Sequence, residues 1–155
     1  MDRSKKIVAK NKAYLKALIL KRIEEEGPNC DLTDIDVSQI TDMAYLFYFT
    51  KFNGDISNWD VSNVEDMHAM FGGSDFNGNI SNWDVSRVKY MSWMFRKSEF
   101  NGDISNWDVS NVKTMESMFE GANFNGDISK WNISNVEDMY YIFGKSSTVL
   151  EKELD

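Results

Sequence analysis

The sequence predicts an α/β repeat solenoid, because one long pattern returns at a fixed interval of 24 residues. The clearest copy is FNGDISNWDVSNVEDMHAMF at residues 52–71. Three related copies follow it, at residues 76–95, 100–119 and 124–143. A weaker copy at residues 28–47 precedes them, so that residues 28–147 hold five units. Such a period is typical of a solenoid, in which each unit buries its apolar face by packing on its neighbours.

Each unit is expected to contain a short strand and a short helix. Residues 59–61 alternate apolar and polar side chains, which is typical of a strand. Ser62 then offers an N-cap, and Glu65 completes a capping box. The apolar residues of this segment have helical spacing: Val64, Met67, Met70 and Phe71. Gly72-Gly73 would end the helix, and Asn53-Gly54 would form the return turn.

The N-terminal segment, residues 1–27, predicts a capping helix for the open end of the stack. A helix over residues 4–26 would begin at Ser4 as its N-cap and end at Gly27-Pro28. Its apolar stripe comprises Ile7, Tyr14, Leu15, Leu18 and Ile23. The alternative is a basic amphipathic helix on an anionic membrane surface, although Glu24-Glu25-Glu26 would oppose that attraction.

The composition argues against several classes of function. The chain has 155 residues with one cysteine and one histidine, so it lacks the residues for an intrachain disulfide or a usual zinc site. Its net charge of -8 disfavours nucleic acid, because phosphate repulsion would have to be overcome. No apolar run approaches the roughly 20 residues of a transmembrane segment. No nucleophile–base pair or phosphate loop is apparent, so we expect neither an enzyme nor a cofactor.

The string FNGDISNWDVSNVxxMxxMF resembles the repeat of the BspA-type leucine-rich-repeat surface proteins, in the form common in mycoplasma-type lipoproteins. The spacing Ile56-x-x-Trp59-x-Val61 is similar to the L-x-x-L-x-L core of leucine-rich repeats. The resemblance covers about three-quarters of the chain. It implies a leucine-rich-repeat-like solenoid with a role in adhesion or protein binding, at a cell surface or secreted. If Met1 is the native start, the sequence contains no export signal and predicts a cytoplasmic protein instead.

Aspartates recur at fixed positions of the repeat and form two predicted columns. One column contains Asp36, Asp60, Asp84 and Asp108, and the other contains Asp55, Asp103 and Asp127. Clustered carboxylates could bind calcium, which would make the protein a calcium-dependent structural or carbohydrate-binding surface module. The other interpretation is that each aspartate accepts backbone N–H bonds in a turn. Asn132 and Asn79 replace aspartate in the two columns and keep the acceptor without the charge, which favours the turn interpretation.

Side chains at the variable positions of the repeat are the candidates for partner binding. On the predicted helical face they are Tyr45, Tyr90, Trp93, Tyr140 and Tyr141. Tyrosine and tryptophan are favoured as interface anchors, but the alternation of Tyr45, Trp93 and Tyr141 with Ala69 and Ser117 in one column would equally suit large-small packing between units. On the strand face, which the resemblance makes the second candidate, the side chains are Asn58, Asp60, Asn82, Asp84, Asn106 and Asp108.

These features predict a non-enzymatic protein-binding module, either adhesin-like or scaffolding. Residues 148–155 are expected to form a short C-terminal cap. A solenoid with one weakly covered end could pair end to end with a second copy, so a homodimer is the expected alternative to a monomer. The repeat does not identify the protein partner.

Overall fold

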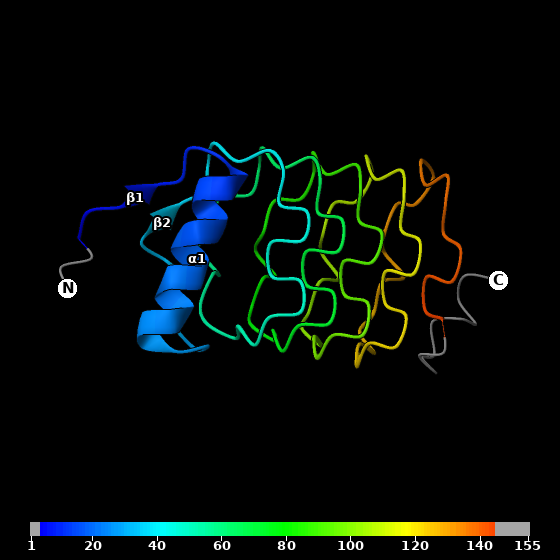
Figure 1. Cartoon of the computed structure of the whole chain (residues 1–155). Helices are drawn as coiled ribbons and strands as arrows, with labels where there is room; N and C mark the ends of the chain where they lie inside the picture. The colour runs from blue at the N-terminus through cyan, green and yellow to red at the C-terminus, as the bar shows by residue number, and fades with distance from the viewer. Residues whose placement is uncertain (1–3, 145–155) are drawn as a thin grey trace.

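The computed structural model describes residues 4–144, and Figure 1 shows one helix across one end of a row of stacked coils. The elements are β1 (Ile7–Val8), α1 (Lys12–Glu26) and β2 (Ile35–Asp36). β1 and β2 pair in parallel, with Ile7 opposite Ile35. From β2 the chain winds coil by coil away from α1, so the two described ends lie at opposite ends of the row (Figure 1).

Successive coils are joined by parallel backbone pairs between residues 24 positions apart. Within residues 4–144 these isolated pairs are Asp31 with Asp55, Asp42 with Asp66, Asp66 with Tyr90, Tyr90 with Thr114, and Thr114 with Asp138. Further bonds continue the ladder: the N–H of Phe71 donates to the carbonyl of Met94 at 2.9 Å, and that of Phe95 to the carbonyl of Met118 at 3.0 Å. A coil therefore completes its backbone hydrogen bonds through its neighbour.

The core contains two columns of stacked phenylalanine rings. One column holds Phe47, Phe71, Phe95, Phe119 and Phe143, with neighbouring centroids 5.4 to 5.8 Å apart. The other holds Phe52, Phe76, Phe100 and Phe124, with centroids 6.0 to 6.2 Å apart. The columns also stack on each other, as Phe95 does on Phe100 at 4.2 Å. All these rings are buried, so the repeat in the sequence is the repeat of the core.

The predicted strand at residues 59–61 is wrong, because side chains rather than backbone pairs join the coils there. Each repeated tryptophan donates its indole N–H to a carbonyl 27 residues earlier, at 3.0 to 3.2 Å. These bonds join Trp59 to Leu32, Trp83 to Ile56, Trp107 to Ile80 and Trp131 to Ile104. Asparagine amides add to them, as where Asn63 donates to the carbonyl of Ser38 at 2.8 Å.

The short helix predicted in each unit is also wrong, since α1 is the one helix among residues 4–144. Consecutive turns replace it: the N–H of Met70 donates to Met67 O, whereas the N–H of Met67 donates to Tyr90 of the next coil. Turns closed by bonds between residues three apart give apolar residues the same three-residue and four-residue spacings as a helix. Ser62 does not cap a helix; its N–H and hydroxyl donate to the Asp60 carboxylate.

The N-terminal helix is shorter than the sequence predicts. α1 begins at Lys12, and the side chain of Asn11 rather than Ser4 accepts the capping bond from the N–H of Tyr14 at 2.8 Å. The residues before it form β1, which adds a strand to the first coil. The buried residues of the helix are Leu15, Ile19 and Arg22, spaced four and three residues apart. Tyr14, which the sequence places in the apolar stripe, is exposed.

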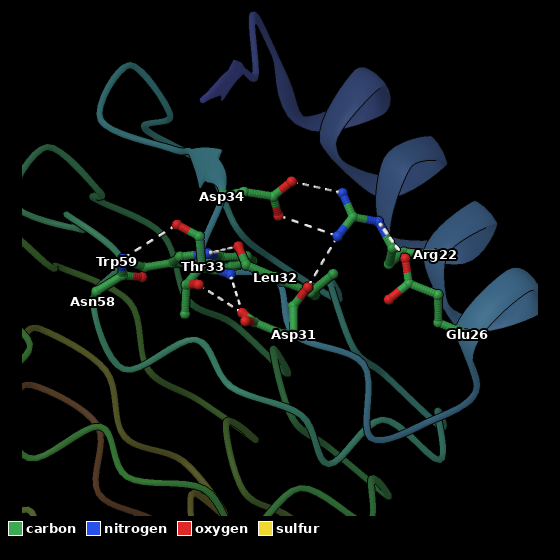
Figure 2. Close-up of polar contacts among 8 residues, drawn as sticks. All are labelled: Arg22, Glu26, Asp31, Leu32, Thr33, Asp34, Asn58 and Trp59. Carbon is green, nitrogen blue, oxygen red and sulfur yellow. Dashed lines mark hydrogen bonds and ion pairs between the residues drawn. The ribbon is translucent and has the colours of Figure 1, made fainter. Parts of the chain in front are cut away.

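A buried ion pair connects α1 to the first coil (Figure 2). The guanidinium of Arg22 donates two hydrogen bonds to the Asp34 carboxylate, at 2.9 and 3.1 Å, and both side chains are at most 7% exposed. It also donates to the carbonyl of Asp31 at 3.0 Å, while its Nε lies 3.5 Å from the Glu26 carboxylate. A buried charged side chain therefore anchors the helix to the end of the stack.

No helix within residues 4–144 is long and apolar enough to cross a membrane. The predicted cap at residues 148–155 lies outside the described residues. End-to-end pairing through that end stays a prediction.

Candidate functional site

Five ring-bearing side chains from three neighbouring coils form a surface cluster, which we call the aromatic patch. Its members are Tyr45, Tyr48, Phe49, His68 and Trp93. Tyr45 contacts Tyr48 edge to face at 5.2 Å and the ring of His68 at 5.2 Å, and Tyr48 contacts Phe49 at 4.5 Å. His68 in turn lies 5.5 Å from Trp93. The rings therefore form a connected surface, in which Phe49 is 67% exposed and Tyr45 is 42% exposed.

The backbone beneath the aromatic patch has the turn conformation that recurs in every coil, since Ala69 and Ser117 in the same column also have positive φ. Tyr45, Phe49 and Trp93 all have positive φ, at 60°, 53° and 62°, which non-glycine residues rarely adopt. Two glycines leave space for their neighbours: a Cβ on Gly72 would lie 2.9 Å from the Tyr48 ring, and one on Gly73 would lie 2.7 Å from the Phe49 ring. The rings thus occupy a surface whose next coil lacks side chains at the contact points.

Charged side chains lie along the aromatic patch. The guanidinium of Arg96 lies 5.1 Å from the centre of the Trp93 ring, within the range of a cation–π contact. Its Nε also donates to the Glu120 carboxylate at 2.9 Å, and this hydrogen bond lowers the pKa of Glu120. From α1, the ammonium of Lys16 donates to the carbonyl of Tyr45 at 2.8 Å. The Arg96–Glu120 pair holds the guanidinium beside the indole ring.

The sequence-predicted aromatic residues fall into separate places. Tyr45 and Trp93 belong to the aromatic patch, whereas Tyr140 and Tyr141 contact each other at 4.2 Å on the last described coil. Tyr90 is exposed, but its ring makes no contact with another ring within residues 4–144. Sequence analysis missed three members of the patch: Tyr48, Phe49 and His68. The signal for two of them is the replacement of the Gly72-Gly73 pair by Tyr48-Phe49 in the first unit.

The alternation of large and small residues in this column has a structural basis. Ala69 and Ser117, which lie between the large side chains of the column, are buried, while Tyr45 and Tyr141 are exposed. The packing and binding interpretations are therefore compatible, since the small residues are covered, Tyr45 and Tyr141 are exposed and Trp93 is half-buried.

The second candidate face carries Asn58, Asp60, Asn82, Asp84, Asn106 and Asp108, all of which are exposed. The prediction that the aspartates accept turn hydrogen bonds is confirmed, as where Asp60 accepts the N–H of Ser62 at 3.0 Å and Asp108 accepts that of Ser110 at 3.0 Å. In the other column, Asp103 accepts from Ser105 at 2.9 Å. Among residues 4–144, no three side chains of His, Cys, Asp or Glu are grouped as a metal ion would require. The calcium-dependent alternative stays an untested prediction.

Acid is expected to destabilise the fold below about pH 4. The hydrogen bonds from the Ser86 and Ser110 side chains lower the pKa values of Asp84 and Asp108. Because the folded-state values lie below the unfolded ones, the ionised carboxylates stabilise the fold above the unfolded pKa. That contribution is lost as the pH falls through the folded pKa.

The double variant Asp84→Asn, Asp108→Asn tests this dependence, because asparagine keeps the turn acceptor, as Asn132 does for Ser134. We expect its melting temperature to fall less than that of the wild type between about pH 5 and about pH 2. Thermal unfolding followed by circular dichroism at several pH values measures the difference. Superimposable pH profiles for the two proteins would contradict a stabilising role of the ionised Asp84 and Asp108 carboxylates.

Comparison with known proteins gives one family match. A family model described as "Mycoplasma protein of unknown function, DUF285" matches residues 20–99 and residues 96–155. The two matches include α1 from residue 20 onward and all of the coils. No curated protein and no solved structure matches the chain. The family description specifies no activity, so the surface of the molecule is the basis for the function proposed below.

Proposed function

We propose a function for this chain, which belongs to the DUF285 family: it is a non-enzymatic protein-binding repeat module, adhesin-like or scaffolding. We also propose that its stack of coils is a solenoid of the BspA-type leucine-rich-repeat kind. The register of 24 residues between coils supports the solenoid. The resemblance of the repeat to BspA-type surface proteins supports the adhesin-like role and a location at a cell surface or outside the cell.

The aromatic patch is the observation that carries this proposal. Tyrosine, tryptophan and arginine dominate the binding energy of protein interfaces, and here Tyr45, Trp93 and Arg96 lie on one surface. The ring contacts and the Arg96–Glu120 hydrogen bond restrict these side chains before a partner arrives. A surface that is ordered in advance loses less side-chain entropy on binding.

The second candidate face, which carries Asn58, Asp60, Asn82, Asp84, Asn106 and Asp108, is the less favoured binding surface. Asp60 and Asp108 already accept hydrogen bonds from serine residues two positions later, and Asn58 donates its amide to the carbonyl of Thr33 at 3.2 Å. A partner would have to compete with these bonds. The aromatic patch instead exposes apolar area, whose burial is favourable without such competition.

The double variant Tyr45→Gly, Trp93→Gly is designed to remove two rings of the aromatic patch with little effect on the fold. Glycine adopts the positive φ of both positions without strain, so the backbone conformation is retained. The immobilised protein would be used to capture proteins from the source organism and from host material. For a partner retained by the wild type, we expect the variant to raise the dissociation constant at least about tenfold, as loss of two anchors implies.

Tyr141→Gly is the matched control, because Tyr141 belongs to the same column, has a φ of 54° and is exposed outside the aromatic patch. It should leave the dissociation constant unchanged. Equal affinity of the wild type and the double variant would contradict binding at the aromatic patch. The variant Asn82→Ser, Asn106→Ser would then test the second candidate face.

A further inference from the structure

A hollow of about 300 Å³ on the surface carries an unusual concentration of positive charge. Its lining residues come from three successive coils: Glu65, Arg87, Lys89, Asn111 and Lys113. Three of them are cations and one is a carboxylate, although the whole chain has a net charge of -8. We call this feature the basic hollow. The positive charge of the hollow therefore comes from the local arrangement of these side chains and not from the overall composition of the chain.

The register of the coils brings the two lysines of the basic hollow together. Residues 65, 89, 113 and 137 occupy one column and read Glu, Lys, Lys, Glu along the stack. The N–H of Lys113 donates to the carbonyl of Lys89 at 2.8 Å, so the backbones of the two lysines are in direct contact. Like charges on adjacent hydrogen-bonded backbones, which lie about 4.8 Å apart in a parallel ladder, destabilise each other. An anion between the two ammonium groups would remove that repulsion.

Donor groups of the basic hollow remain available after the internal contacts are made. Lys89 pairs with Glu65 at 3.1 Å, and Arg87 uses Nη1 to donate to the Asn63 side chain at 2.8 Å. Within residues 4–144, none of the ion pairs or side-chain hydrogen bonds of the structure involves the ammonium of Lys113. The hollow therefore presents one uncommitted ammonium beside a guanidinium with further N–H groups.

We propose that the basic hollow binds a dianionic oxyanion, namely the phosphate group of a phosphorylated side chain or inorganic phosphate. A phosphate monoester carries a charge of about -1.5 to -2 at neutral pH, which matches the charge excess of the lining residues. Lysine binds phosphate as a point charge, and arginine offers a planar set of donors. The volume of about 300 Å³ leaves room for a carrier of the phosphate. This inference does not depend on the aromatic patch or on its partner.

Titration of the full chain with inorganic phosphate, followed by amide chemical shifts in NMR, tests the proposal. We expect the saturating shifts to be confined to residues 87–89 and 111–113. Lys113→Gln should weaken binding about three- to fivefold, while Lys51→Gln, which removes an exposed lysine that does not line the hollow, should have no effect. Glu65→Gln should strengthen binding, whereas Asp75→Asn, which removes an exposed carboxylate elsewhere, should not.

The pH provides a second readout. A phosphate monoester becomes a monoanion as the pH falls through about 6, and inorganic phosphate does so at a higher pH, so binding of either should weaken between about pH 7.5 and about pH 5.5. Sulfate keeps its charge over that range and should bind equally at both values. Shifts spread over the whole surface, or equal weakening by Lys113→Gln and Lys51→Gln, would overturn the proposal.

A phosphoserine peptide distinguishes the two sources of the phosphate. Binding at least tenfold tighter than that of inorganic phosphate, with no binding of the same peptide carrying serine, would assign the hollow to a phosphorylated side chain. Equal affinity of the peptide and the free ion would assign it to inorganic phosphate. Neither result depends on Trp93, so failure of this proposal is distinguishable from failure of the proposed protein binding.

Discussion

Replacing Phe95 by alanine is expected to lower the free energy of unfolding by about 3–5 kcal/mol. Phe95 is fully buried at the centre of the stack. Its ring stacks on Phe71 at 5.6 Å and on Phe119 at 5.8 Å, in the coils on either side, and on Phe100 at 4.2 Å. Truncation would open a cavity in contact with both neighbouring coils, which hydrogen-bonded backbones cannot easily close. Urea unfolding followed by circular dichroism measures the loss.

Phe49→Ala is the control for this substitution, because it removes the same side chain from a position that is 67% exposed. Its effect should stay within about 0.5 kcal/mol. If the two alanine variants lost similar stability, the stacked columns of phenylalanine would not be the core of the molecule. Phe95→Leu retains most of the volume and should give an intermediate loss.

Replacing Arg22 by methionine is expected to lower the free energy of unfolding by about 3–5 kcal/mol. The substitution leaves the Asp34 carboxylate, whose side chain is 6% exposed, without the guanidinium that donates two hydrogen bonds to it. An unpaired buried charge retains its desolvation cost and loses its compensating attraction. The same urea titration measures this effect.

Two further variants test whether burial of the Arg22–Asp34 pair is the cause. The double variant Arg22→Met, Asp34→Leu removes both charges and should recover most of the stability, because an apolar pair of similar volume often replaces a buried ion pair without loss. Arg96→Met breaks the pair with Glu120, whose side chains are about 30% exposed, and should cost about 1 kcal/mol or less. An equally large loss in Arg96→Met would contradict the role of burial.

The period of the fold could be predicted from the sequence, whereas the local conformation could not. Phe76 and Phe100 recur 24 residues apart because their rings stack in adjacent coils, so the pattern reports the stacking directly. The helix predicted from Val64, Met67 and Met70 fails because turns bonded between residues three apart give the same apolar spacing. What distinguishes the two conformations is a bond to the next coil, such as that from Met67 to Tyr90, and no local pattern encodes it.

The candidate site was predicted in part for a related reason. Tyr45 and Trp93 stand out because they interrupt a repeat at positions that vary. His68 connects them across coils, at 5.2 and 5.5 Å, although it belongs to a different column of the sequence alignment. The anchoring role of Arg22 was not predicted, because its carboxylate partner, Asp34, lies in the first coil, beyond the end of the helix. Both contacts depend on how segments come together, which a single repeat does not show.

Both proposed sites depend on the register of 24 residues in which each coil bonds to the next. The most direct test is the scalar coupling across hydrogen bonds, measured by NMR on the labelled chain. We expect a coupling between the amide nitrogen of Phe95 and the carbonyl carbon of Met118, because the N–H of Phe95 donates to that carbonyl at an N···O distance of 3.0 Å. A coupling from Phe95 to Met91 instead would indicate a helix in each repeat and would contradict the hydrogen-bonded register between coils.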